Sequence, residues 1–488
     1  MTAASAAARN NITTETDMLS LNPTSLARGA ALTLKLDDGS RVGVIGGAPA
    51  GAFFSYFLLQ TAQRIGLDLQ VDIYEARDFS LPAPQGCNMC GGIMSESLVQ
   101  ALTVEGINLP PTVVQRGIDS YVLHMEEGSV RIETPLHEKR IAAVHRGNGP
   151  RGIKEKKWRS LDGYLLELAV NKGARAVRER VDGVAWDNSR PQIKTRSGLS
   201  ETYDLLAVGV GVNSGTLKLF EDLGIGYKAP QTAKTYIREF YFGHETIEKF
   251  LGSSMHVFLL NMRGLEFAAL IPKGDYVTLV LLGEEIDGSL VESFLNTPVV
   301  SQCLPPNWRE LKEFCHCSPK INVQSAVRPF ADRIVFIGDS GATRLYKDGI
   351  GAAYRTGKAA AVTAVFEGIS ADDFRRHFWP ACRAISNDNL LGKLIFFVTR
   401  HIQKWSHDRR GVLRMVAREQ RHEGGRRRMS MVLWDIFTGS APYKDILLRT
   451  LHPAFLGGFV WAIAAGAWSK MIGGRHGNER VRQNIPGR

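Results

Sequence analysis

The 488-residue sequence is poor in cysteine, and we expect no signal peptide from its opening residues. Six cysteines are too few to hold a chain of this length together through a disulfide framework. The opening residues are small and polar, without the charged, apolar and small order of a secretory signal. We therefore expect a cytoplasmic protein in a reducing setting, with residues 1–40 as a flexible tail. With 44% hydrophobic and 22% charged residues, the composition is that of a folded chain of two or three domains.

Acidic residues are scarce in the last quarter of the chain. Residues 374–488 hold 21 lysines and arginines against 7 acidic residues, so the net charge of +11 comes from this region. The stretch NLLGKLIFFVTRHIQKW mixes apolar and cationic residues, which is typical of a helix lying on anionic lipid. Nucleic acid would also suit such charge, but the sequence has no nucleic-acid recognition module. We predict a helical, basic region over residues 374–488 that associates peripherally with an anionic membrane surface.

An uncharged run over residues 453–469 is short for a membrane span. It has 17 residues, whereas a spanning helix needs about 20. A borderline span, a hairpin that dips into the membrane and a buried core helix all remain open. The nearby cations, with Trp461 and Trp468, favour docking at the membrane interface.

A glycine-rich turn near the N-terminus has the pattern of a dinucleotide-binding site. Gly46, Ala48 and Gly51 occupy the three positions of G-x-G-x-x-G between a predicted strand, 41–45, and a predicted helix, 52–63. Glycines there permit a tight turn and let the backbone approach a pyrophosphate. A second strand, LQVDIYEAR, ends at Glu75, an acid placed to accept the hydroxyls of a ribose. The predicted cofactor contacts in this unit are Gly46, Gly47, Ala48, Ala50, Gly51, Glu75, Ala76 and Arg77.

A second glycine-rich segment identifies the type of dinucleotide. A buried strand over 333–337 ends in Gly338 and Asp339, and Gly349–Gly351 opens an alanine-rich helix. An acid at a strand end can accept a sugar-alcohol hydroxyl, and a helix N-terminus offers N–H groups to a ring that becomes anionic on reduction. These features suit the ribityl chain and ring of a flavin, which nicotinamide enzymes do not need. We therefore predict FAD as the cofactor, contacted also by Gly338, Asp339, Gly349, Ile350 and Gly351.

Five landmarks, in order, resemble those of the para-hydroxybenzoate hydroxylase-type flavoproteins and, within them, the geranylgeranyl reductase family. They are IGGAPAG, the acid-ended strand, WRSLDGYLLELAVNKGA, DLLAVGVGVNS and GDSG…KDGIG, and the likeness covers about residues 41–368. It implies an α/β fold, α+β overall. A Rossmann-like FAD-binding domain (41–118, 152–232 and 322–373) would be interrupted by an antiparallel β-sheet substrate domain (119–151 and 233–321).

The electron donor does not follow from the sequence. Val210 stands where relatives carry an acid that organises the pyrophosphate region and, in the hydroxylases, NADPH use. The sequence has no second dinucleotide fingerprint. Both observations argue against NAD(P)H and leave a protein or a quinol as the alternative donors.

The stretch GCNMCGGIMSESL has two cysteines at Cys-x-x-Cys spacing. In the geranylgeranyl reductases a Cys-Gly-Gly segment lies beside the flavin, so the resemblance places Cys90, Gly91 and Gly92 there, with Cys90 as the candidate catalytic residue. Two other interpretations stay open: an inert buried pair, or a metal or cluster site that recruits Cys315 and Cys317. That spacing is not a specific ligand set, and we predict no metal.

Alternating apolar patterns predict several strands between residues 120 and 283. The family carries a Tyr-x-Trp-x-Phe-Pro segment on this sheet, which Phe267–Pro272 matches in frame. The resemblance implies substrate contacts from Phe267, Ala269, Ile271 and Pro272. Ala269 replaces the tryptophan, which would make room in an apolar pocket. The loop over residues 144–152 either contacts flavin or substrate or is a plain surface loop.

The resemblance, together with these patterns, implies an FAD-dependent oxidoreductase that reduces carbon–carbon double bonds of an isoprenoid or other apolar lipid. An FAD-dependent monooxygenase or halogenase acting on an apolar substrate is one alternative. A membrane-bound flavoprotein that carries electrons to quinone is another.

Overall fold

The computed structural model describes residues 34–87, 89–134, 138–151, 158–310, 315–422 and 426–472, with side chains up to residue 464. The residues from Leu34 onward form one compact unit, so the division into domains stays a prediction.

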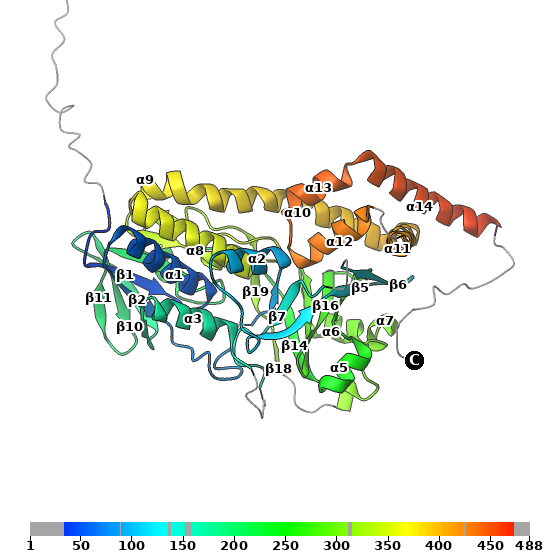
Figure 1. Ribbon diagram of the computed structural model, residues 1–488, viewed down its shortest axis with the longest axis horizontal. Helices are drawn as coiled ribbons and strands as arrows, with labels where there is room; N and C mark the ends of the chain where they lie inside the picture. The colour runs from blue at the N-terminus through cyan, green and yellow to red at the C-terminus, as the bar shows by residue number, and fades with distance from the viewer. Residues whose placement is uncertain are drawn as a thin grey trace, which may run out of the picture. The chain divides into compact units, whose positions relative to one another are not determined.

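A six-stranded sheet carries the glycine-rich motifs (Figure 1). Its order is β20 (Phe330–Ala331), β21 (Ile334–Phe336), β12 (Leu205–Val208), β1 (Ser40–Ile45), β2 (Leu69–Tyr74) and β8 (Arg175–Val177), parallel except for β20. Val42 and Val44 are fully buried, as expected for a central parallel strand covered on both faces. Helix α1 (Pro49–Ile65) packs on this sheet, and α3 (Leu161–Asn171) and α8 (Gly349–Phe366) pack against α1.

A seven-stranded sheet forms the second layer. Its order is β18 (Cys315–Cys317), β14 (Tyr236–Tyr241), β17 (Tyr276–Gly283), β16 (Leu265–Lys273), β15 (Ser254–Phe258), β5 (Ser120–Met125) and β6 (Gly128–Glu133). Only β15 and β5 pair in parallel. A separate three-stranded sheet has the order β3 (Ile93–Met94), β7 (Ile141–Val144) and β4 (Val114–Ile118). The strands predicted between residues 120 and 283 are present.

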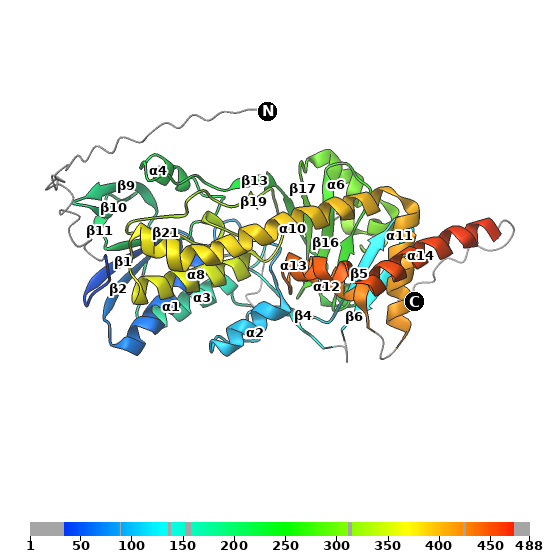
Figure 2. The same ribbon diagram turned by 90° about the horizontal axis from the view of Figure 1, so that it is seen from above.

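The C-terminal region is helical, as predicted, and covers the seven-stranded sheet (Figure 2). Its helices are α10 (Trp379–Lys404), α11 (Ser406–Arg421), α12 (Arg428–Thr438), α13 (Tyr443–Thr450) and α14 (Pro453–Ile472). Their inner faces share one hydrophobic cluster with the sheet, in which Phe396 and Phe437 contact Phe267.

Smaller elements complete the described chain. The helices are α2 (Glu96–Val104), α4 (Leu217–Glu221), α5 (His244–Phe250), α6 (Gly288–Leu295), α7 (Pro298–Ser301) and α9 (Ala371–Asp373). The strands are β9 (Val181–Asp187), β10 (Arg190–Thr195), β11 (Ser200–Thr202), β13 (Gln231–Lys234) and β19 (Lys320–Gln324).

Candidate active site

One cavity joins the glycine-rich motifs of the six-stranded sheet to the inner face of the seven-stranded sheet. Of the predicted site residues, it is lined by Gly46, Ala48, Ala50, Glu75, Arg77, Cys90, Gly91, Gly92, Phe267, Ala269, Ile271, Asp339, Gly349 and Ile350. Gly47, Gly51, Ala76, Pro272, Gly338 and Gly351 are not part of this lining. Residues from three distant parts of the chain, about 46–92, 267–271 and 339–350, therefore meet at one place.

The first glycine-rich turn is shaped by two close approaches. Gly46 has a φ of +100°, a region that favours glycine. A Cβ atom on Gly51 would lie 1.9 Å from the Gly46 carbonyl oxygen, so only glycine fits there. Gly51 thus lets α1 start close to the end of β1, and it is needed for the turn although it does not face the cavity.

Glu75 lines the cavity and is hydrogen-bonded to the first glycine-rich turn. Its carboxylate accepts hydrogen bonds from the backbone N–H groups of Gly47 (3.0 Å) and Arg77 (2.9 Å). Burial raises the pKa of Glu75, and the Arg77 N–H and charge partly oppose this. The acid at the end of β2 therefore lies where the sequence predicts it, and its oxygens are held by the backbone.

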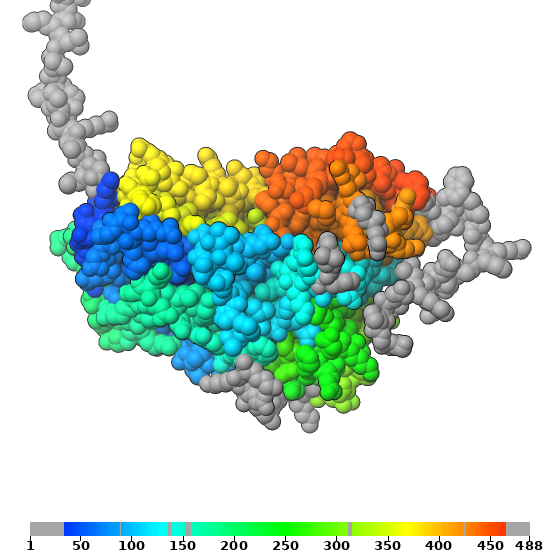
Figure 3. All heavy atoms as spheres, viewed as in Figure 1, coloured from blue at the N-terminus to red at the C-terminus, as the bar shows by residue number. Residues whose placement is uncertain are grey.

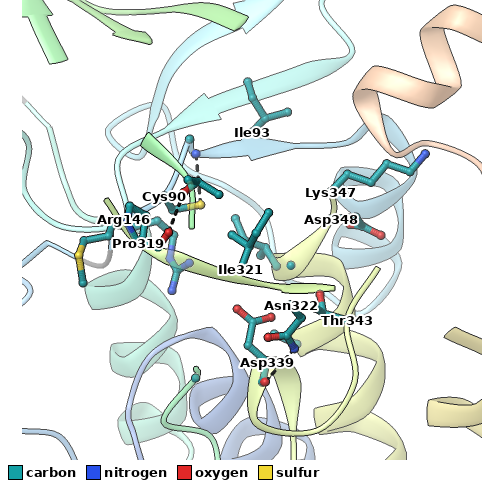
Figure 4. A pocket seen from close by; sticks show the side chains of 18 of the residues that line it. Cys90, Ile93, Arg146, Pro319, Ile321, Asn322, Asp339, Thr343, Lys347 and Asp348 are labelled. Atoms are coloured by element: carbon teal, nitrogen blue, oxygen red, sulfur yellow. Dashed lines mark hydrogen bonds between the residues drawn. The ribbon is translucent and has the colours of Figure 1, made fainter. Parts of the chain in front are cut away.

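Asp339, another residue that lines the cavity, has an unsatisfied carboxylate oxygen. Its Oδ1 has no hydrogen-bond partner, and neither does Oδ1 of Asn322, whose amide donates to the Asp339 carbonyl (2.9 Å). Both lie beside Thr343 in Figure 4. Burial raises the pKa of Asp339, and the opposing charge of Arg146 lowers it in part. Buried polar atoms are normally paired, so these two acceptors fit a ligand that offers hydroxyl donors, as the ribityl chain of FAD does.

Cys90 lies on the cavity wall with Arg146 beside it (Figure 4). The Cys90 sulfur accepts a hydrogen bond from the Gly92 backbone N–H (3.3 Å). Arg146 forms a two-point ion pair with the fully buried Asp162 of α3, with N···O distances of 2.5 and 3.0 Å. Burial lowers the pKa of Arg146, but its interactions with Asp162 and Cys90 raise this pKa by more. Arg146 is therefore a permanent cation beside the Cys90 sulfur. Arg146 belongs to the loop over residues 144–152, and it makes this loop part of the site.

A smaller cavity next to the first is lined by four cysteines, Cys87, Cys90, Cys315 and Cys317. Pairing of β14 with β18 places Ile237 opposite Cys317 and Glu239 opposite Cys315. Burial raises the pKa of Cys87 and raises that of Cys317 to about 12, so both thiols are protonated at neutral pH.

These thiols do not converge as metal ligands do. Among the described residues, the group whose ligand atoms all lie within 4.8 Å of one another is His124, His256 and Cys303. There Nε2 and Nδ1 of His124 are hydrogen-bonded to His256 (2.9 Å) and Ser129 (2.6 Å). Hydrogen bonding inside the core accounts for these histidines.

The part of the cavity under the seven-stranded sheet is apolar. Alternate residues on four neighbouring strands point into it: Ile237, Met255, Phe267, Ala269, Ile271, Val280 and Leu282. Phe437 of α12 lines the cavity as well. We call this part the apolar chamber. Pro272 lies on the other face of β16 with Ala268 and Leu270, because side chains alternate along a strand.

Lys347 is a lining residue that the sequence reasoning missed. Its ammonium donates to the Asp435 carbonyl (2.8 Å) and lies 4.0 Å from the centre of the Tyr443 ring. Burial, with the charge of Arg344, lowers the pKa of Lys347 to about 7, against the opposing charges of Asp348 and Asp435. A lysine in a cavity with such a pKa can change its protonation state near neutral pH.

Comparisons with known proteins place this fold. No family model matches the chain, and no curated protein matches it. A flavoprotein/dehydrogenase from Cytophaga hutchinsonii has 13% identity and a TM-score of 0.55, covering 88% of this chain and 100% of that chain. A variant of the halogenase PltM in complex with FAD has 10% identity and a TM-score of 0.54, covering 91% and 93%. A variant of HpxO from Klebsiella pneumoniae complexed with FAD has 13% identity and a TM-score of 0.50, covering 84% and 97%.

The fold is therefore one that this chain shares with solved flavoproteins, two of them in complex with FAD, and the predicted fold class is confirmed. FAD, the predicted cofactor, is bound by neighbours with this fold. The paired glycine-rich motifs and the unpaired oxygens of Asp339 and Asn322 fit the same cofactor.

Proposed function

We propose that this protein is an FAD-dependent oxidoreductase that reduces carbon–carbon double bonds of a prenyl-type or similar apolar lipid. The observation that carries the proposal is the apolar chamber, which is continuous with the cavity lined by the glycine-rich motifs. FAD that is bound and has been reduced by the electron donor would supply the hydride equivalent for such a reduction and would return to its oxidised form.

The chain offers candidate contacts for FAD at three places. The turn at Gly46–Gly51 and Glu75 suit the pyrophosphate and adenosine ribose. Asp339 and Asn322 suit the ribityl hydroxyls, and the N-terminus of α8 suits the ring.

The chamber favours a hydrocarbon over a polar aromatic substrate. The seven strand residues that line it have no side-chain hydrogen-bonding group. A substrate hydroxyl or carboxylate placed against them would lose its hydrogen bonds to water without replacement, which costs about 1–3 kcal/mol for a neutral polar group. Apolar surface gains about 25 cal/mol per Å² when it is buried there. Positioning of the isolated double bond must then supply much of the rate, because such a bond is a poor hydride acceptor.

Cys90 is the proposed proton source. Its thiol lies on the cavity wall beside Arg146 and can give a proton to the second alkene carbon, directly or through a water held there. Cys90→Ser with FAD still bound should lower the reduction rate, while Cys87→Ser should leave it close to wild type. Equal rates in all three proteins would exclude Cys90 as the essential acid.

A monooxygenase or halogenase is the second candidate function, because structural neighbours include a halogenase. Transfer of electrons to a quinone is the third. Protein reduced without oxygen separates the three, since absorbance near 450 nm reports oxidised flavin. Recovery of that absorbance on adding a polyprenyl lipid supports the reductase. Recovery with a quinone alone supports electron transfer, and recovery with oxygen coupled to a hydroxylated or halogenated product supports the second candidate. Titration of the oxidised protein with NAD(P)H tests the donor, for which we propose a protein or a quinol.

A further inference from the structure

The C-terminal helices carry most of the exposed apolar surface of the described chain. Of 19 large hydrophobic residues that are exposed among the described residues, 11 lie between Leu390 and Trp461. These residues concentrate exposed apolar side chains on the C-terminal helices. Such a concentration on a protein surface marks a binding site. Figure 3 shows the helices that follow α10, in orange, along the upper edge of the molecular surface.

On α10 the exposed apolar residues form one stripe. Leu390, Leu394, Phe397 and Val398 recur at helical spacing, and Phe397 is 63% exposed. The opposite face of α10 is buried through Ile395 and Phe396, so the stripe points away from the protein.

The stripe is bordered by cations and lacks acids. Lys393 and Lys404 are exposed on the same face of α10. Asp388 is turned inward, where its carboxylate accepts hydrogen bonds from the backbone N–H groups of Tyr443 (3.0 Å) and Lys444 (2.9 Å). The charge of this face therefore suits an anionic surface.

The bent pair α13–α14 extends the same surface. Exposed apolar residues continue along it through Leu448, Leu451, Leu456, Val460 and Trp461, the last two being 64% and 57% exposed. The exposed Asp445 of α13 lies next to the exposed Lys444, and the sequence has no acidic residue between 446 and 464. In the described part of the chain no single helix is long and apolar enough to cross a membrane, and α13 with Pro453–Ala464 passes that test only as a pair bent by 65°. The exposure of Val460 and Trp461 shows that the described part of α14 is not a core helix.

Only one layer of helices separates this surface from the apolar chamber. Phe396 on the inner face of α10 stacks on Phe267 of the chamber, with 6.1 Å between ring centres. The next residue, Phe397, points outward. Phe437 of α12 lines the chamber directly.

We propose that the outer face of α10, α13 and α14 docks on an anionic lipid bilayer and that the apolar substrate enters the chamber from this side. We call this face the docking surface, defined by Leu390, Leu394, Phe397, Val398, Leu448, Leu451, Leu456, Val460 and Trp461 with Lys393 and Lys404. Docking rests on the exposed surface alone; only the delivery of substrate rests on the proposed function.

Vesicle flotation with the full chain tests the docking surface. The probes are vesicles of phosphatidylcholine alone and of phosphatidylcholine mixed with phosphatidylserine. Wild type should float with the mixed vesicles and more weakly with the neutral ones. The variant Phe397→Ser with Trp461→Ser should lose affinity by about tenfold or more, because two aromatic side chains no longer enter the bilayer interface.

A matched control removes exposed apolar residues elsewhere. Val104→Ser with Trp186→Ser changes side chains that are 87% and 41% exposed on α2 and β9, and it should bind vesicles like wild type. Replacing Lys393 and Lys404 by glutamate should abolish the preference for the mixed vesicles. Equal binding by all variants, or no binding by wild type, would overturn the proposal. So would a stable dimer that Phe397→Ser with Trp461→Ser dissociates, since the surface would then be covered by a second copy. Flotation needs no catalysis, so failure of the reductase assay would leave its result unaffected.

Discussion

Replacing Asp339 by alanine should separate FAD binding from fold stability. The Oδ1 atom of Asp339 has no hydrogen-bond partner within the protein, and burial raises the pKa of the carboxyl group. In the flavin-free protein this carboxylate therefore destabilises the fold. With FAD bound, it would accept a hydrogen bond from a ribityl hydroxyl. A hydrogen bond to a charged group contributes about 1.5–3 kcal/mol, which corresponds to roughly 10- to 150-fold in affinity.

Two assays measure the two effects. Titration of the flavin-free protein with FAD, followed by flavin fluorescence, should show this loss of affinity in Asp339→Ala. Chemical denaturation of the flavin-free protein at pH 8 should show a free energy of unfolding that is unchanged or higher, most clearly in the isosteric Asp339→Asn. Unchanged FAD affinity, or reduced stability without loss of affinity, would refute the reasoning and make Asp339 a structural residue.

Three further predictions concern the turn, the chamber and the buried lysine. Gly51→Ala places a Cβ atom 1.9 Å from the Gly46 carbonyl oxygen, so the protein should lose bound FAD, as read from its absorbance near 450 nm. Ala269→Trp should fill the apolar chamber and lower the turnover of a prenyl lipid by at least about tenfold, because a misfit of one methylene already costs about 1–3 kcal/mol. The affinity for FAD should stay the same. Unchanged turnover would place the substrate elsewhere. Lys347 has a pKa of about 7 when folded and a higher one when unfolded, so the unfolded chain binds the extra proton between these two values. The stability of wild type relative to Lys347→Met should therefore rise with pH above 7, by about 1.4 kcal/mol per pH unit, and a pH-independent difference in denaturation experiments would contradict this.

Local sequence patterns predicted the parts of the site that local geometry controls. The turn at Gly46–Gly51 and Glu75 follow strands directly, and Asp339 comes three residues after the end of β21, so a strand, a turn and a residue type are enough to place them. The same holds for Gly349 at the start of α8.

Residues that depend on tertiary packing were not predictable in the same way. The ion pair with Asp162 of α3 holds Arg146 at the site, and the sequence spacing of the two residues does not predict this pair. Lys347 stands in the KDGIG motif, whose pattern predicts contacts only for Gly349–Gly351, and the pKa of Lys347 depends on its burial. Phe437 of α12 lies in the chamber wall although it follows Phe267 to Ile271 by 166 residues or more in the sequence.

Strand alternation could have refined one prediction. Phe267, Ala269 and Ile271 share a parity and line the chamber, whereas Pro272 has the other parity and faces away. Side-chain alternation on a strand would have excluded Pro272 from the sequence alone.

The most direct test of the central claim is the mass of the product. Protein with FAD bound is reduced without oxygen and incubated with a polyprenyl lipid in vesicles that contain phosphatidylserine, and the extracted lipid is analysed by mass spectrometry. We predict a lipid that has gained one pair of hydrogen atoms for each double bond reduced, with a matching return of oxidised flavin. A lipid of unchanged mass, or one that gains oxygen or halogen once air and halide are admitted, would contradict the account.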